Sequence, residues 1–166
     1  MRLTRGPVRA FGHGWAFAGK RPGEDSMGGH DAGDDGAWPE ELRLRSGKDG
    51  LVITFTDGVS GELSAEFLRV WSPSAEVRGH GAADRKTVGG KQGVRITALE
   101  PIGNYAVRIV FDDGHDTGLY GWRLLRSMVT RQEAMWGEYL AELAHKGMSR
   151  QAFPGKASPG FLKKGR

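Results

Sequence analysis

One short segment of the chain concentrates side chains that could do chemistry. Residues 112–116 read Asp-Asp-Gly-His-Asp, so the imidazole of His115 is surrounded by carboxylates. Imidazole and carboxylate together form the ligand set of non-haem iron sites, and a histidine beside carboxylates can also act as a general acid or base. His80 and Glu76 are candidates for completing such a site. The spacing is not diagnostic of a metal, and the simplest interpretation is that His115 stabilises its own turn by hydrogen bonding.

The sequence lacks the residues that several other kinds of catalytic or metal site require. The chain has no cysteine, which excludes disulfides, a thiolate nucleophile and cysteine-ligated zinc or iron–sulfur clusters. Gly89-Gly90-Lys91 lacks the context of a phosphate-binding loop. An oxygenase iron site needs two histidines and a carboxylate, yet Asp116 directly follows His115, and the only later histidine, His145, falls on an expected outer helix. We therefore expect no catalytic residue and no cofactor: zinc is not expected, and iron remains an alternative through His115.

The charge balance is mildly basic. The 166 residues include 24 Lys+Arg and 20 Asp+Glu, a formal net charge of +4. Nucleic-acid binding requires the cations to cluster on one face. Arg85, Lys86, Lys91 and the terminal lysines are the candidates, but no aromatic residues alternate with them for base stacking, so we expect no nucleic-acid partner. No apolar run approaches the ~18 residues of a membrane-spanning helix, so we expect no membrane contact and a cytoplasmic location.

The elements that must position His115 are mostly strands. Residues 42–45 alternate apolar and polar, and Leu51–Thr56 is β-branched and leads into Asp57-Gly58, a strong hairpin signal at which both central positions favour positive φ. Ser64 predicts an N-cap for a short helix from Ala65 to Leu68. Residues 70–81 are expected to form a loop, and 94–99 and 105–111 to be strands joined by a turn at 101–104. The alternation along 105–111 places Tyr105, Val107, Ile109 and Phe111 on one face.

The two ends of the chain differ from this region. Residues 1–37 are rich in glycine and without period, which predicts a disordered leader; Met27 is an alternative start of the natural protein. Helical spacing around Trp122 and Leu125 predicts one helix. Residues 129–147 are predicted to form a C-terminal amphipathic helix, with a capping box from Thr130 to Glu133, an apolar stripe of Trp136, Tyr139, Leu140 and Leu143, and Gly147 as its C-cap. Residues 148–166 are predicted to be a flexible basic tail.

These elements predict one α+β domain over residues 38–128: a small, mostly antiparallel β-sheet domain of hairpins and short helices, followed by the C-terminal amphipathic helix. Two segments share a pattern, since residues 53–58 and 109–114 each read as a strand ending in Asp-Gly. Each is followed by a return strand and a short helix that ends in Leu-Arg. This repetition is weak evidence for internal pseudo-symmetry.

The ordered series of these motifs resembles a known family. Trp38-Pro39-Glu40-Glu41-Leu42, the Asp57-Gly58 hairpin, Leu68-Arg69-Val70, Ile102-Gly103-Asn104-Tyr105-Ala106 and the segment from Asp113 to Trp122 are similar to the N-terminal domain of gamma-butyrobetaine hydroxylase. The likeness covers about residues 38–128 and includes free-standing bacterial members. In that family the domain also occurs attached to iron–sulfur carrier ATPases and to 2-oxoglutarate-dependent hydroxylases.

The resemblance implies a structural zinc site that this chain does not preserve. In the hydroxylase, three cysteines follow the first short helix and a histidine from the Asp-Gly-His turn completes the site. Ser72, Ser74 and Val77 stand at the cysteine positions here, and His115 at the histidine position. A serine hydroxyl does not ionise near neutral pH and valine has no donor atom, so zinc lacks its ligands. We expect Ser72 and Ser74 to hydrogen-bond local backbone instead, and Val77 to pack in place of the metal.

The resemblance thus implies a non-catalytic binding or accessory module whose zinc site is lost. Its expected partner is another protein, with iron and iron–sulfur enzymes as candidates because the domain is found attached to them. The alternative is an iron-binding protein or oxygenase-related enzyme that uses His115.

Overall fold

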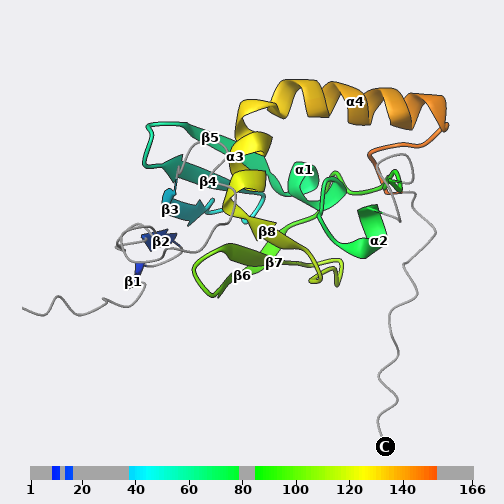
Figure 1. Cartoon of the computed structure of the whole chain (residues 1–166). Coiled ribbons are helices and arrows are strands. Elements are labelled where there is room, and N and C mark those ends of the chain that lie inside the picture. The colour runs from blue at the N-terminus through cyan, green and yellow to red at the C-terminus, as the bar shows by residue number, and fades with distance from the viewer. Residues whose placement is uncertain (1–8, 12–13, 17–37, 79–84, 153–166) are drawn as a thin grey trace, which may run out of the picture.

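Two antiparallel sheets and four helices make up the described part of the chain, as Figure 1 shows. The computed structural model describes residues 9–11, 14–16, 38–78 and 85–152. One sheet has the order β1-β2-β3-β4-β5 and the other β6-β7-β8. This is the predicted α+β class. The elements are β1 (Arg9–Phe11), β2 (Gly14–Ala16), β3 (Pro39–Leu44), β4 (Gly50–Phe55), β5 (Ser60–Ser64), α1 (Ala65–Val70), α2 (Ala75–Arg78), β6 (Ile96–Ile102), β7 (Ala106–Phe111), β8 (Leu119–Gly121), α3 (Trp122–Thr130) and α4 (Gln132–His145).

Two strands lie in the segment for which we predicted no order. β1 pairs with β2, and β2 pairs with β3 in the register Trp15 opposite Leu42. The prediction of a disordered leader is therefore wrong for residues 9–11 and 14–16. The edge of β3 supplies hydrogen-bond partners that local sequence patterning does not reveal, and such tertiary pairing can override weak strand propensity. The remaining residues of the predicted leader lie outside the described part of the chain.

The hairpin between β4 and β5 uses a different turn from the one predicted. Phe55 N–H donates to the Val59 carbonyl at 2.8 Å, and Gly58 N–H donates to the Phe55 carbonyl at 3.0 Å. Gly58 has φ +85°, whereas Asp57 does not adopt positive φ. The turn is thus a three-residue connection with a single left-handed glycine. The hairpin prediction is confirmed, but positive φ at both central positions is wrong.

The second hairpin repeats this turn. Phe111 N–H donates to the His115 carbonyl at 2.9 Å, and Gly114, with φ +84°, donates to the Phe111 carbonyl at 3.2 Å. The following helices also begin alike, since Ser64 before α1 has φ −67° and ψ 152° and Gly121 before α3 has φ −67° and ψ 154°. The repeated sequence pattern therefore corresponds to two units of similar backbone, β4-β5-α1 and β7-β8-α3.

Each unit is tied to the other by the same kind of ion pair. The carboxylate of Asp57, in the first turn, accepts from Arg126 Nη2 at 2.6 Å, and Arg126 lies on the helix of the second unit. Reciprocally, Asp113 in the second turn accepts from Arg69 Nε at 2.8 Å, and Arg69 lies on α1 of the first unit. These crossed pairs fix how the two hairpins face one another. We refer to them as the reciprocal Asp–Arg pairs.

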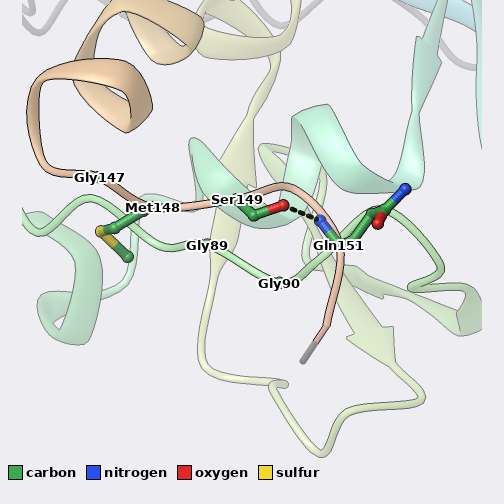
Figure 2. A pocket seen from close by; sticks show the side chains of 6 residues that line it. All are labelled: Gly89, Gly90, Gly147, Met148, Ser149 and Gln151. Carbon is green, nitrogen blue, oxygen red and sulfur yellow. Dashed lines mark hydrogen bonds between the residues drawn. The ribbon is translucent and has the colours of Figure 1, made fainter. Parts of the chain in front are cut away.

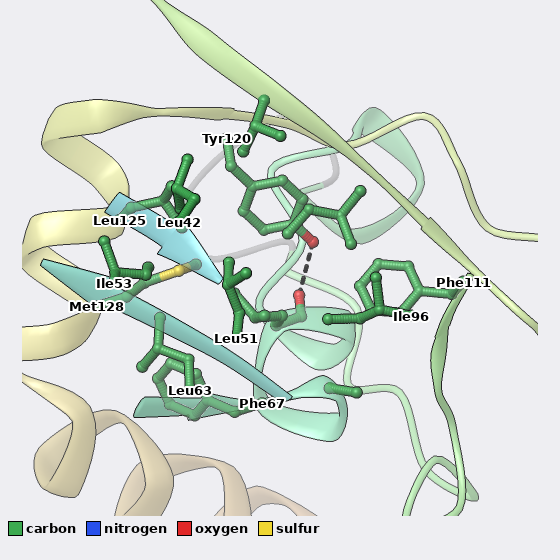
Figure 3. Close-up of a cluster of buried hydrophobic side chains, with 14 of the residues drawn as sticks. Leu42, Leu51, Ile53, Leu63, Phe67, Ile96, Phe111, Tyr120, Leu125 and Met128 are labelled. Atoms are coloured by element: carbon green, nitrogen blue, oxygen red, sulfur yellow. Dashed lines mark hydrogen bonds between the residues drawn. The ribbon is translucent and has the colours of Figure 1, made fainter. Parts of the chain in front are cut away.

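The two sheets share one hydrophobic core, drawn in Figure 3. Leu51, Ile53 and Phe55 alternate inward from β4 and are fully buried. Ile109 and Phe111 contribute from β7 in the same way. Tyr105 does not join them: β7 begins only at Ala106, and Tyr105 is 58% exposed, although the predicted alternation placed it on the same face as Val107, Ile109 and Phe111.

One strand is longer than predicted. β6 continues through Pro101 to Ile102, where we predicted a turn. It pairs only with β7 within the described sheet. Proline fits an edge strand because its missing N–H can face away from the ladder, so the strand can extend to residue 102.

The C-terminal helix is confirmed, with two local corrections. Thr130 ends α3, and its hydroxyl donates back to the carbonyls of Arg126 and Ser127, so it does not form the predicted capping box. The buried face of α4 consists of Met135, Tyr139 and Leu143, whereas the predicted Leu140 is 40% exposed. Met135, Tyr139 and Leu143 follow the i, i+4, i+8 spacing of one helix face.

The end of α4 leads into an ordered segment. Gly147, with φ +61°, donates to Ala144 O at 3.2 Å, and Met148 N–H donates to Leu143 O at 2.8 Å. This is a Schellman motif, which confirms Gly147 as the stop signal. Residues 148–152, which we call the strap, then pack against the loop at Gly89 and Gly90. The prediction of a loose tail from residue 148 is wrong for the strap; residues 153–166 lie outside the described part.

Candidate functional site

The site expected from the sequence lies between the α1–α2 region and the turn that leaves β7. Ser72 and Ser74 follow α1, and Val77 lies on α2, a helical turn inside the segment that we predicted to be a loop. The structure brings Ser72 against His115, with 2.8 Å between the hydroxyl oxygen and Nε2. Glu76 Oε2 lies 3.2 Å from the other ring nitrogen, Nδ1.

The donors and acceptors of this group can be assigned. A carboxylate can only accept, so Nδ1 of His115 donates to Glu76. In a neutral imidazole Nε2 is then the acceptor, and the Ser72 hydroxyl donates to it. The Ser72 oxygen in turn accepts from the backbone N–H of Ser74 at 3.4 Å. His115 therefore links the α1–α2 region to the β7 turn through its ring. It also hydrogen-bonds within its own turn, as expected, through its backbone: Phe111 N–H donates to its carbonyl at 2.9 Å, and Asp113 Oδ1 accepts its N–H at 3.2 Å.

The two serines behave differently from one another. Ser72 bonds local backbone, as we expected, and also bonds the histidine ring. The hydroxyl of Ser74 is buried and has no hydrogen-bond partner among the described residues. Our expectation that it would bond local backbone is wrong, because its own N–H, and not its hydroxyl, makes the contact within this turn. Val77 is 2% exposed, so it packs in the interior as predicted.

Electrostatics favour the neutral form of His115. Burial lowers the pKa of His115, and the nearby positive charge of Arg69 lowers it further, against the opposing effect of Glu76. The side chain is only 2% exposed. For Asp113, burial alone would raise the pKa, but the hydrogen bond from Lys91 and the charge of Arg69 hold it below its ordinary value. The site is therefore a neutral histidine beside a fully paired carboxylate.

Tyr120 and Gly118 belong to this site although sequence reasoning did not single them out. The Tyr120 hydroxyl donates to the Leu68 carbonyl at 2.7 Å, and burial raises the pKa of the phenol. A Cβ on Gly118 would lie 2.4 Å from the Ser72 hydroxyl and 3.0 Å from the Tyr120 ring. The Gly118-Leu119-Tyr120 segment carried a strand signal but nothing that marked the close approach of its glycine.

The other candidate ligands are dispersed. Asp112 is used at the start of the turn, where Oδ1 accepts from Arg95 N–H at 3.0 Å. Asp116 and His145 are exposed. His80 lies outside the described residues. No group of three or more potential ligand residues capable of holding a metal ion is found in the described ranges.

Two of the cations predicted as a basic patch are engaged in ion pairs, whereas Lys86 is exposed and the terminal lysines lie outside the described residues. Arg85 bonds Glu142 at 2.6 Å, and its guanidinium lies 3.6 Å from the centroid of the Trp71 ring. Lys91 bonds Asp113 at 2.5 Å. These charges hold segments of this chain together. Within the Gly89-Gly90-Lys91 segment, Gly90 N–H donates to the strap at 2.8 Å.

In terms of chemistry, the order Ser72–His115–Glu76 matches that of a hydrolase triad. A nucleophile must reach its substrate, however, and Ser72 is only 1% exposed. A cavity of about 260 Å³ lies elsewhere, lined by the strap and by Gly89 and Gly90 (Figure 2). The Ser72–His115–Glu76 arrangement is thus a buried hydrogen-bonded cross-link.

Among the described residues, no helix is long and apolar enough to cross a bilayer.

These features define a small α+β domain with a closed, hydrogen-bonded histidine at the junction of two similar halves. The family model for gamma-butyrobetaine hydroxylase-like, N-terminal domains matches residues 42–126. The chain belongs to this family.

Three solved structures are similar to this chain. Two proteins known from NMR solution structures are 44% and 40% identical, with TM-scores of 0.63 and 0.62. The matches cover 75% and 76% of this chain and 92% and 98% of those proteins. A crystal structure of a protein of unknown function from Acidithiobacillus ferrooxidans, assigned to the DUF971 family, is 33% identical over 55% of this chain and 91% of that one, with a TM-score of 0.46. A comparison with curated proteins found no match.

Proposed function

We propose that this protein is a non-catalytic binding or accessory module. The observation that carries the proposal is the burial of the Ser72–His115 pair, since Ser72 and His115 are 1% and 5% exposed. A general base or nucleophile must contact its substrate. With both side chains committed to hydrogen bonds inside the fold, they serve to hold it together, and the surface is left for partner binding.

We propose iron and iron–sulfur proteins as the partner class to test first, and the cytoplasm as the location. The support is the resemblance to domains that occur attached to such proteins, which is an argument by association. Affinity purification from the native cell, with metal content measured on the same sample, tests both ideas. Recovery of a specific iron-containing partner is the expected result. Return of the bait alone under several wash conditions would contradict the proposal.

A second candidate function has one observation in its favour. The alternative of an iron-binding or oxygenase-related protein rests on the imidazole of His115 and the carboxylate of Glu76, which lie 3.2 Å apart. The two functions separate in a single assay of purified protein. Iron retained in stoichiometric amount, together with 2-oxoglutarate turnover that His115→Gln abolishes, would favour the alternative over a non-catalytic module.

A further inference from the structure

The strap carries an arginine that is recognised as a ligand would be. Arg150 Nε and Nη2 bond the two carboxylate oxygens of Glu66 at 3.0 and 2.7 Å. Glu66 is only 5% exposed, although it lies on α1. The guanidinium also lies 4.9 Å from the centroid of the Trp136 ring. A buried carboxylate beside an aromatic face selects the planar two-pronged guanidinium over the single ammonium of lysine.

The rest of the strap is recognised through its backbone. Gly90 N–H donates to Ser149 O at 2.8 Å, and Gln92 N–H donates to Arg150 O at 3.0 Å. These bonds do not depend on strap side chains. A Cβ on Gly89 would lie 2.9 Å from the Ser149 carbonyl, so glycine is required for this close approach. We call the residues that hold the strap (Glu66, Trp136, Gly90 and Gln92) the groove. The groove recognises one arginine within an extended peptide backbone.

The strap lies beside a cavity. Figure 2 shows the strap running beside Gly89 and Gly90, and residues of both segments line a cavity of about 260 Å³. Gly147 precedes the strap in a left-handed conformation, with no atom within 4 Å of the position its Cβ would take. The strap thus follows an uncrowded glycine where a hinge could act.

We propose that the strap is an internal ligand of a groove that binds an arginine-containing extended peptide of a partner protein. The partner's arginine replaces Arg150 on Glu66, and its backbone accepts from Gly90 and Gln92. This proposal rests on the proposed role as a binding module, and it names the surface and the chemistry of the partner. Since the strap and the partner peptide compete for the same carboxylate, the intact protein binds more weakly than one whose strap arginine is removed.

Hydrogen exchange on the intact wild-type protein tests whether the strap can leave. The amides of Gly90 and Gln92 are expected to exchange by a local opening that depends little on denaturant, while those of Leu51 and Ile53 in β4 require global unfolding. Identical free energies of exchange at all four amides would overturn the proposal, because the strap would then separate only when the whole domain unfolds.

Peptide binding tests the recognition itself. The probe is the hexapeptide Gly-Met-Ser-Arg-Gln-Ala, a copy of residues 147–152, titrated into the full-length Arg150→Ala variant and followed by tryptophan fluorescence and calorimetry. We expect binding at least about tenfold tighter than to wild type, and a loss of about tenfold or more when lysine replaces the peptide's arginine. The Glu66→Gln variant is the control and is expected to bind neither peptide.

The outcomes separate cleanly. The proposal is refuted if a folded Arg150→Ala protein does not bind the arginine peptide, or binds the lysine peptide equally well. Either result would still allow the protein to bind a partner through another surface. If Arg150→Ala does not fold, Arg150→Lys replaces it, because the ammonium keeps one ion pair with Glu66. Displacement of the strap by the arginine peptide is then read from faster exchange at Gly90.

Discussion

Gly118 offers the sharpest test of how the histidine site is packed. A Cβ at this position would lie 2.4 Å from the Ser72 hydroxyl oxygen, about 1 Å inside an ordinary van der Waals contact. Gly118 is not among the glycines with positive φ, so alanine adds no backbone strain there. The effect of Gly118→Ala is therefore steric.

The expected cost follows from two contributions. Overpacking of a filled interior costs about 1–3 kcal/mol. If Ser72 rotates away to relieve the contact, its bond to His115 is lost, at about 1 kcal/mol. We expect Gly118→Ala to lower the free energy of unfolding by about 3 kcal/mol, measured by urea denaturation with tryptophan fluorescence.

Two further variants make the reasoning refutable. Gly93→Ala is the matched control, because a Cβ there meets nothing within 4 Å and the φ is ordinary; its free energy of unfolding should stay within about 0.5 kcal/mol of wild type. Ser72→Ala removes the atom that clashes, so the double variant Ser72→Ala/Gly118→Ala should lose less stability than the two single variants combined, by about 1 kcal/mol or more. Additive losses would show that the close approach of Ser72 is not the cause.

The remaining predictions concern the same site. Because the pKa of His115 is lowered by folding from an ordinary value of 6.5, its contribution to stability is complete above that pH and is lost as pH falls toward the folded value; His115→Gln should flatten the stability profile between pH 7 and 5, and an unchanged slope would contradict the assignment. Tyr120→Phe leaves the buried Leu68 carbonyl of α1 without its donor and should lower the free energy of unfolding by about 1–2 kcal/mol in urea melts. An unchanged free energy of unfolding would contradict the idea that this carbonyl depends on the Tyr120 hydroxyl. The triple variant Ser72→Cys, Ser74→Cys and Val77→Cys should bind zinc in stoichiometric amount, as measured by elemental analysis. Zinc already bound by the wild type would contradict the inference that serine and valine at these positions leave zinc without ligands.

Local sequence chemistry was sufficient for both hairpins and for α1 and α3, but not for α2, which lies in the segment predicted to be a loop. Asp57-Gly58 and the Asp-Gly of the second turn specify their turns through one left-handed glycine each, and Ser64 does cap α1, accepting Phe67 N–H at 3.1 Å. These signals lie within a few residues of the structure they determine, which is why they could be read from one sequence.

What escaped prediction depends on contacts between distant segments. The pairing of β2 with β3, and the clamp of Arg150 on Glu66 across 84 positions of sequence, have no local pattern. The membership of Ser72 and His115 in one site came from the family resemblance, but their direct hydrogen bond did not. Glu76 was considered only as a possible metal ligand, since sequence cannot show that a carboxylate 70% exposed at its side chain still reaches a buried ring.

The reciprocal Asp–Arg pairs bear on whether one half of the domain can fold without the other. Asp57 is neutralised by Arg126 and Asp113 by Arg69, so each half supplies the counter-charge for the other's turn. A fragment that carries only one half would lose the ion pairs that join its turn and its helix to the other half. The domain is therefore expected to melt in one concerted transition, and neither half is expected to be separable as an autonomous module.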